Sequence, residues 1–293
     1  MNWLTAWTLD PGLILGLVVL LEAYIIGIGP LRRRYRLGAP ATKRQITWFA
    51  LGYLALVVAL VSPLHALGEV YLFSAHMVQH ILITLVGPPL LLLGTPGWLL
   101  SPLLRIPLVE TLARSVTAPV FAFLAFNGAF ALWHVPSFYD AALNRELLHT
   151  LEHGSFFGAA VLMWWPILSP MSELPRLPLG FQAFYLFLLS IPQKIIGALI
   201  TFASEVLYPT YEIAPRVTGL SALADQQLGG IIMWVPGGLI IFGAFTTLFF
   251  LWMGPSDPGP TLVVPAADAP GRRNGHVEPD MLSTPPPPPA PSA

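Results

Sequence analysis

Long apolar runs are the feature that most constrains what this chain can fold into. Seven such runs lie between short polar connections, at 12–30, 46–62, 72–94, 117–133, 149–168, 180–203 and 225–253. A helix that crosses a bilayer needs roughly 20 mostly apolar residues, and each run is close to that length or, for 225–253, longer. The runs are continuously apolar rather than alternating, which argues against a membrane β-barrel.

Composition supports the same conclusion. Only 10% of the residues are charged and 55% are hydrophobic, whereas a soluble domain carries about 25% charged residues. Too few polar side chains remain to cover a surface that faces water. The sequence therefore predicts an all-α fold, a polytopic integral membrane helix bundle with about seven transmembrane helices.

Basic residues indicate which connections face the cytoplasm. The connection after the first run holds a basic cluster, Arg32, Arg33, Arg34, Arg36, Lys43 and Arg44. Most of the other basic residues fall in the third and fifth connections or in the C-terminal tail. Cytoplasmic loops carry an excess of Lys and Arg, so we expect the N-terminus outside and the C-terminus inside. Because the basic cluster follows the first run, that run does not fit a cleaved signal peptide.

The chain divides into two parts. Residues 1–254 contain all the apolar runs and form the expected seven-helix membrane domain. Residues 255–293 are rich in Pro and lack a core-forming pattern, and such a composition cannot bury enough apolar surface to offset the entropy of ordering. We expect a disordered Pro-rich cytoplasmic tail. The net charge is −1 and no basic block suggests a nucleic-acid partner.

Histidines gather at one end of the expected bundle. With the orientation above, the outer end receives His65, His76, His80, His134, His149 and His153. Two pairs, His76 with His80 and His149 with His153, have i, i+4 spacing, which places both imidazoles on one helix face. Such pairs suit a metal ion, and imidazole binds Cu, Zn, Fe or Ni. Cysteine is absent, so a metal site must use His, Met, carboxylate or backbone ligands.

Two other residues complete this expected site. Met233, in the last run, is a candidate thioether ligand on the same helix face as Gln226, and a thioether favours Cu(I). Glu152 is expected to accept a hydrogen bond from an imidazole and orient it. Two alternatives remain. The histidines can simply hydrogen-bond their neighbours, or His149-Thr-Leu-Glu-His153 can act as the H-x-x-E-H motif of inverted zinc peptidases, with Glu152 as general base and Glu205 as a further ligand.

Two ionisable residues fall inside apolar runs. Glu22 lies midway along the first run and Lys194 lies within the sixth. Charges at such depth are costly and usually face the bundle interior. We expect the two to form a buried pair that supports the site. Pro192 and Gln193, which precede Lys194, predict a break in the sixth run.

Several motifs occur in an order that resembles a known family. They are His76-Met-Val-Gln-His80, Gly94-Thr-Pro96, Trp133-His134-Val-Pro136, His149-Thr-Leu-Glu-His153, Tyr208-Pro209-Thr-Tyr211 and Asp225-Gln226-Gln227. Over residues 65–253 this series resembles the CtaG-type assembly factors of caa3-type cytochrome c oxidase. The family's histidine motifs match His76, His80, His134, His149 and His153. His65, Asp225 and Gln226 are carried over as supporting residues.

The resemblance implies a function without catalytic turnover. It implies a multi-pass protein of the bacterial cytoplasmic (inner) membrane that helps to build an active caa3-type or aa3-type oxidase. It further implies a copper ion as cargo, oxidase subunit I as the recipient, and a periplasmic copper chaperone as a donor. Three other functions remain open: a membrane electron carrier whose paired histidines on facing helices bind heme as axial ligands, a copper or proton transporter, and an assembly scaffold that binds no metal.

Overall fold

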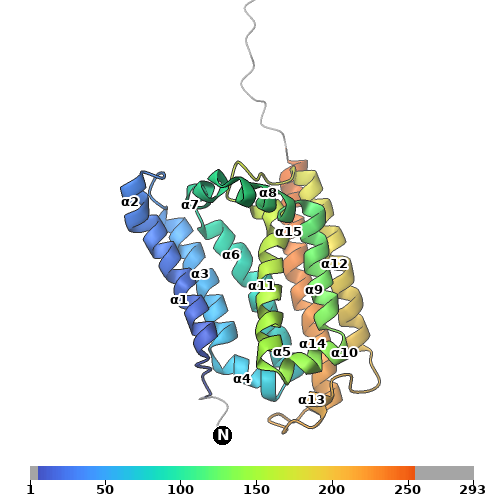
Figure 1. The fold of residues 1–293 in the computed structure, drawn as a ribbon. Coiled ribbons are helices and arrows are strands. Elements are labelled where there is room, and N and C mark those ends of the chain that lie inside the picture. Colours follow the sequence, from blue (N-terminus) through green and yellow to red (C-terminus); the bar gives the residue numbers. More distant parts are fainter. Residues whose placement is uncertain (1–5, 255–293) are drawn as a thin grey trace, which may run out of the picture. The chain divides into compact units, whose positions relative to one another are not determined.

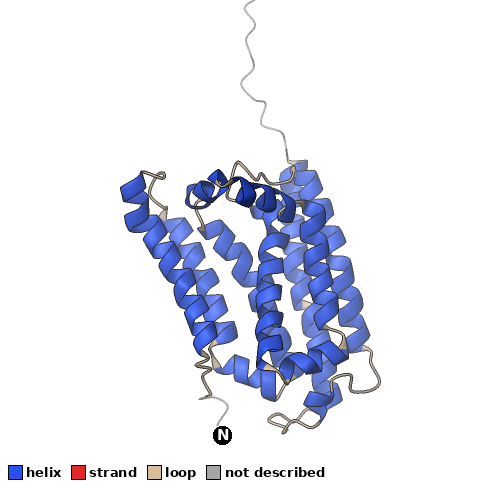
Figure 2. Cartoon of the chain, in the orientation of Figure 1, coloured by secondary structure: helices blue, strands red, loops and turns tan. Residues whose placement is uncertain are grey.

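The computed structural model describes residues 6–254, and this part of the chain is a bundle of helices without a β-strand (Figures 1 and 2). The expected all-α fold is therefore confirmed for the described residues. The expected Pro-rich tail, 255–293, lies outside them.

The first two long helices stand side by side at one edge of the bundle (Figure 1). Helix α1 (Pro11–Ile26) continues through a π-helical turn (Gly27–Leu31) into α2 (Arg32–Tyr35), and α3 (Lys43–Leu60) runs back along it. Thr42 begins α3 with a capping box, in which Thr42 and Gln45 satisfy each other's backbone N–H groups. The short α4 (Pro63–Val70) follows α3 with a bend of 43°.

The next helical segment, Phe73–Gly94, runs through the interior. It comprises α5 (Phe73–Ile81), a π-helical turn (Leu82–Val86) and α6 (Gly87–Gly94). Pro88 has no N–H to donate to the preceding turn. The carbonyl of Thr84 is satisfied instead by the indole N–H of Trp164, at 3.0 Å. The segment therefore continues as one buried unit despite Pro88 and Pro89, and it carries two of the histidines inward.

The remaining helices complete the bundle. They are α7 (Gly97–Leu100), a 3-10 turn (Ser101–Arg105), α8 (Pro107–Val116), α9 (Pro119–Trp133), α10 (Pro136–Leu143), α11 (Glu146–Leu168), α12 (Leu179–Thr201), α13 (Pro209–Glu212), α14 (Ala222–Trp234) and α15 (Pro236–Met253). Helices α4, α10 and α13 lie at one end, which we call the histidine end, and α2, α7 and α8 lie at the other (Figure 1). At that other end Arg36, Arg105 and Arg114 line a common cleft. The histidines and the basic connections therefore lie at opposite ends, as expected.

Four helical segments in the described part are long and apolar enough to cross a membrane, and up to six if each of two bent pairs counts as one span. The four are Pro11–Tyr35, Phe73–Gly94, Leu179–Thr201 and Ala222–Met253, and the bent pairs are α3 with α4 and α8 with α9. Helix α11 has the required length, 23 residues, but polar site residues occupy its first turns. The chain is thus a membrane protein, while the count of seven spans stays a prediction.

The expected pair of Glu22 and Lys194 is not formed. Both side chains are exposed, no ion pair joins them in the described part of the chain, and their helices, α1 and α12, lie on opposite sides of the bundle (Figure 1). The physical reason is the position of α1, which packs only against the edge of the bundle and leaves most of its surface outside. Neither residue supports the histidines.

The break that proline was expected to cause in the sixth run is absent, and a break occurs in the seventh run instead. Helix α12 runs unbroken through Pro192, and the Gln193 amide donates to the Leu189 carbonyl at 3.3 Å. The seventh run, in contrast, is divided. Helix α14 ends at Trp234 and α15 begins at Pro236, because proline is accommodated in the first turn of a helix, where its missing N–H is not needed.

Candidate metal centre

Helix α5 is held in place by a carboxylate from a distant part of the chain. Leu72, which precedes α5, has no side chain that can cap it. Asp225 of α14 takes this role: its Oδ2 accepts from Phe73 N at 2.7 Å and its Oδ1 from Ser74 N at 3.4 Å and from the Ser74 hydroxyl. A carboxylate at a helix N-terminus is favoured by the helix dipole. Asp225 therefore fixes the position of α5 and, with it, the direction of the first histidine pair.

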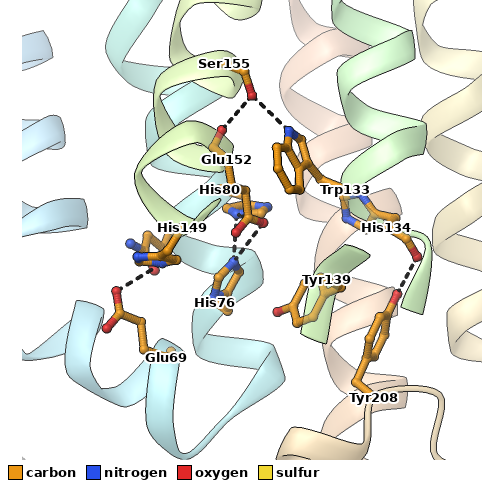
Figure 3. A network of polar contacts seen from close by, with 12 residues as sticks. Glu69, His76, His80, Trp133, His134, Tyr139, His149, Glu152, Ser155 and Tyr208 are labelled. Carbon is orange, nitrogen blue, oxygen red and sulfur yellow. Dashed lines mark hydrogen bonds and ion pairs between the residues drawn. The ribbon is translucent and has the colours of Figure 1, made fainter. Parts of the chain in front are cut away.

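His76 and His80 point from α5 into the core and meet a carboxylate from α11 (Figure 3). Their Nε2 atoms lie 2.8 Å apart. Glu152 Oε1 lies 3.6 Å from His76 Nε2 and 3.5 Å from His80 Nε2. All three residues are buried. Glu152 therefore faces two imidazoles of the neighbouring helix, but the expected hydrogen bond from an imidazole is not formed in this structure.

His153 of α11 contributes a third imidazole. One ring nitrogen from each of His76, His80 and His153 lies within 4.8 Å of the others. A metal ion bound tetrahedrally at 2.0–2.1 Å would hold such nitrogens about 3.3 Å apart. Small side-chain rotations therefore suffice to bring the three imidazoles, which we call the inner site, onto one ion.

Unpaired polar atoms make the inner site suited to a cation. His153 is 4% exposed, and in the described part of the chain neither of its ring nitrogens has a hydrogen-bond partner. The Nδ1 atoms of His76 and His80 and both Glu152 carboxylate oxygens are also buried without hydrogen-bond partners. An unsatisfied buried polar group costs about 1–3 kcal/mol. A cation at the inner site would offset that cost for the imidazoles and for the carboxylate.

A second group lies nearer the surface of the histidine end. It comprises His65, Glu69 and His149, each with one ligand atom within 4.8 Å of the others. Glu69 Oε1 lies 3.1 Å from His149 Nε2 and also contacts His65 Nε2 (Figure 3). His149, which the sequence analysis places with His76, His80 and His153 in one site, belongs instead to this outer group. One turn of helix separates it from His153, with which it also shares a group through Glu152.

His134 and Met233 lie on the far side of His80. His134, at the C-terminal end of α9, pairs its Nδ1 with the Phe130 carbonyl at 2.7 Å, and its Nε2 is buried without a partner. The rings of His80 and His134 are 6.1 Å apart. Met233 lines a small cavity of about 20 Å³ together with both histidines. The structure thus places the two residues beside the inner site, but outside the group of three imidazoles.

Loop residues brace this end of the bundle. Gln226 accepts from Leu207 N at 2.6 Å and donates to the Glu205 carbonyl at 3.2 Å. The Tyr208 hydroxyl donates to the His134 carbonyl at 3.1 Å (Figure 3). Burial raises the pKa of Tyr208, so its hydroxyl stays protonated and able to donate. Gln226 therefore ties the loop after α12 to α14, and Tyr208 ties the same loop to His134 at the end of α9.

Sequence reasoning missed several residues of the site. Glu69 follows His65 at i, i+4 spacing, and this signal would have found it. Gln79 donates to His65 Nδ1 at 2.8 Å, and its place inside the motif His76-Met-Val-Gln-His80 was the one signal that marked it. The Tyr139 ring lies 5.2 Å from that of His76 and is also buried.

The zinc-peptidase interpretation loses its further ligand in this structure. His149, Glu152 and His153 do lie close enough to share an ion. Glu205, however, is exposed in the loop after α12, and its backbone rather than its carboxylate contacts Gln226. It is not a member of any metal-binding group in the described part of the chain.

Fold and site together define a helical membrane protein with a buried, histidine-rich candidate metal centre. A family model described as cytochrome c oxidase caa3 assembly factor matches residues 22–254. The chain therefore belongs to the family of caa3 cytochrome c oxidase assembly factors, as the order of its motifs predicts.

Curated relatives occur in mycobacteria. An uncharacterized protein of Mycobacterium bovis is 28% identical over 265 residues, which cover 85% of this chain and 40% of that protein. An uncharacterized protein of Mycobacterium leprae is 26% identical over 267 residues, which cover 86% and 40% of the two chains. The chain thus spans about 40% of the length of these relatives. No solved structure gives a significant match.

Proposed function

We propose that this protein assists the assembly of a caa3-type or aa3-type cytochrome c oxidase by holding a copper ion and delivering it to oxidase subunit I. The observation that carries the proposal is the inner site: three buried imidazoles with close ring nitrogens, of which His153 has no hydrogen-bond partner at either nitrogen in the described part of the chain. Membership in an oxidase assembly family supplies the context. The protein acts as a carrier and not as an enzyme, and oxygen reduction takes place in the client.

Copper fits the chemistry of these ligands. Imidazole nitrogens bind copper, and affinity for divalent metals rises toward Cu²⁺ in the first-row series. Three protein ligands leave one position of a tetrahedral ion open. A ligand from subunit I can enter this position before the carrier's own imidazoles leave. Glu152 supplies a negative charge beside the cation, which lowers the cost of burying each of them.

Heme is less compatible with the geometry of the inner site. His76 and His80 lie one turn apart on the same helix, with their Nε2 atoms 2.8 Å apart. They therefore cannot together bind the two faces of one porphyrin, and a heme would need one axial ligand from α5 and one from α11. A scaffold that binds the oxidase without a metal would leave the unpaired atoms of His153 without an explanation.

The proposed location is the bacterial cytoplasmic membrane, with seven spans, the histidine end outside and the C-terminus inside. The basic connections at the opposite end of the bundle support this orientation. We expect a reporter that works only in the cytoplasm to be active after Gly254 and inactive within residues 205–224. Activity in the reverse pattern would contradict the orientation and the outer position of the histidines.

The copper function predicts a specific defect in cells that lack this protein. Subunit I should still reach the membrane, but it should contain little copper, and oxidase activity should fall. Excess copper in the medium should restore part of the activity, because mass action replaces delivery. The measurement is the copper content of purified subunit I. A full complement of copper in subunit I from the deleted strain would contradict copper delivery.

A further inference from the structure

Two members of the outer group, Glu69 and His149, are more exposed than the inner site, while the third, His65, is equally buried. The side chain of Glu69 is 27% exposed and that of His149 is 14% exposed, whereas that of His76 is 0% exposed. Glu69 therefore places a partly exposed carboxylate side chain beside the two imidazoles of the outer group. A negative charge at the mouth of a low-dielectric site attracts cations and raises their rate of association.

Gln79 gives the outer group a way to release His65 for metal binding. Its amide nitrogen donates to His65 Nδ1 at 2.8 Å, so the proton of this imidazole resides on Nε2 and faces Glu69. The other end of the amide, Gln79 Oε1, is buried without a hydrogen-bond partner. Half a turn of the amide would let Oε1 accept from a protonated Nδ1, which leaves Nε2 free to bind an ion. A hydrogen bond of this kind fixes the tautomer of a metal-binding histidine.

A third group connects the outer group to the inner site. His149, Glu152 and His153 also have ligand atoms within 4.8 Å of one another. This connecting group shares His149 with the outer group and His153 with the inner site. An ion can therefore exchange its ligands one at a time along the three groups and remain bound to the protein at each step.

We propose that His65, Glu69 and His149 form a loading site that takes up a copper ion and passes it through His149, Glu152 and His153 to the inner site. This inference rests on the proposed function, because it takes the inner site to hold copper. It adds a separate point of entry, in which Glu69 attracts the ion and His149 hands it on. The outer group and the inner site share no residue, so both can be occupied at once.

Copper loading of the purified full-length protein tests this proposal. The probe is copper ion alone, added to protein in lipid nanodiscs under oxidising conditions and, separately, with a reductant. Wild-type protein should bind about two equivalents per chain, one for each site. Glu69→Gln should lose the weaker equivalent and keep the affinity of the inner site within about twofold. Its rate of loading should fall by about tenfold or more, because the attracting charge is gone.

Glu146→Gln is the matched control. Glu146 is an exposed carboxylate in the first turn of α11, close to the same end of the bundle, and it lies outside all three groups. It should load like the wild type. Glu69→Asp retains the charge and should restore most of the loading rate, which separates a loss of attraction from a loss of folding.

Two results would overturn the proposal in different ways. If Glu69→Gln loads at the wild-type rate and binds as many equivalents, the loading site is wrong while the inner site stands. If wild-type protein binds no copper in either condition, the proposed copper function fails and the loading site fails with it.

Discussion

His153→Ala is expected to abolish tight copper binding and to leave the protein in the membrane at a normal level. The substitution removes one of three imidazoles from the inner site and breaks the connection to the outer group. Copper affinity should fall by at least about 100-fold, since even residues that only orient a metal ligand contribute about 10-fold to 100-fold. Competition with a copper chelator measures this change.

The stability of the same variant separates a ligand from a structural residue. His153 has no hydrogen-bond partner in the described part of the chain, so alanine removes an unpaired buried group along with its packing contacts. We expect little change in the melting temperature of the metal-free protein. His276, in the tail, is the control, and His276→Ala should bind copper normally. A His153→Ala protein with wild-type copper affinity would remove His153 from the site.

Asp225→Ala should have the largest effect on stability. The Asp225 side chain is 0% exposed and accepts hydrogen bonds from Phe73 N, Ser74 N and the Ser74 hydroxyl. Alanine leaves these groups of α5 buried without partners, and an unsatisfied buried group costs about 1–3 kcal/mol. We expect the free energy of unfolding to fall by about 3 kcal/mol or more. Thermal unfolding in detergent would measure the loss.

A second capping residue provides the control for Asp225. Asp10 begins α1 and accepts a single hydrogen bond, from Leu13 N at 2.8 Å, at a half-buried position. Asp10→Ala should cost about 1 kcal/mol, the usual value for a helix cap. Equal losses for Asp10→Ala and Asp225→Ala would show that Asp225 is an ordinary cap and does not secure α5 within the core.

The sequence allowed the helical fold to be predicted because lipid-facing and buried helices share one signal, a run of apolar residues. Breaks within the runs were harder to predict, because the effect of a proline on a helix depends on the residues that pack around it. Pro192 lies within an unbroken α12, whereas Pro236 begins a new helix. The predicted pair of Glu22 and Lys194 was wrong for a related reason. The position of a residue along an apolar run gives its depth in the membrane, but not the side of the bundle on which its helix lies.

The candidate site was predictable in its members but not in its grouping. The i, i+4 spacing correctly places His76 and His80 together. For the second pair, the same spacing cannot tell that His153 faces α5 while His149 faces Glu69. Contacts between distant segments decide this, and a single sequence does not contain them.

The contribution of Asp225 is of the same kind. Its position in a motif indicates importance, but its role as the cap of α5 depends on the packing of α14 against α5. Local spacing in the sequence therefore identifies the candidate ligands. Tertiary contacts determine which of them lie close enough to share an ion.

Metal analysis of the purified protein tests the central claim most directly. Wild-type protein should be compared with a variant in which His76, His80, His134, His149 and His153 are all alanine. We expect at least about one equivalent of copper in the wild type and none in the variant, with no Soret absorption from heme in either. Wild-type protein that binds no copper under reducing or oxidising conditions would contradict the account and favour a metal-free scaffold.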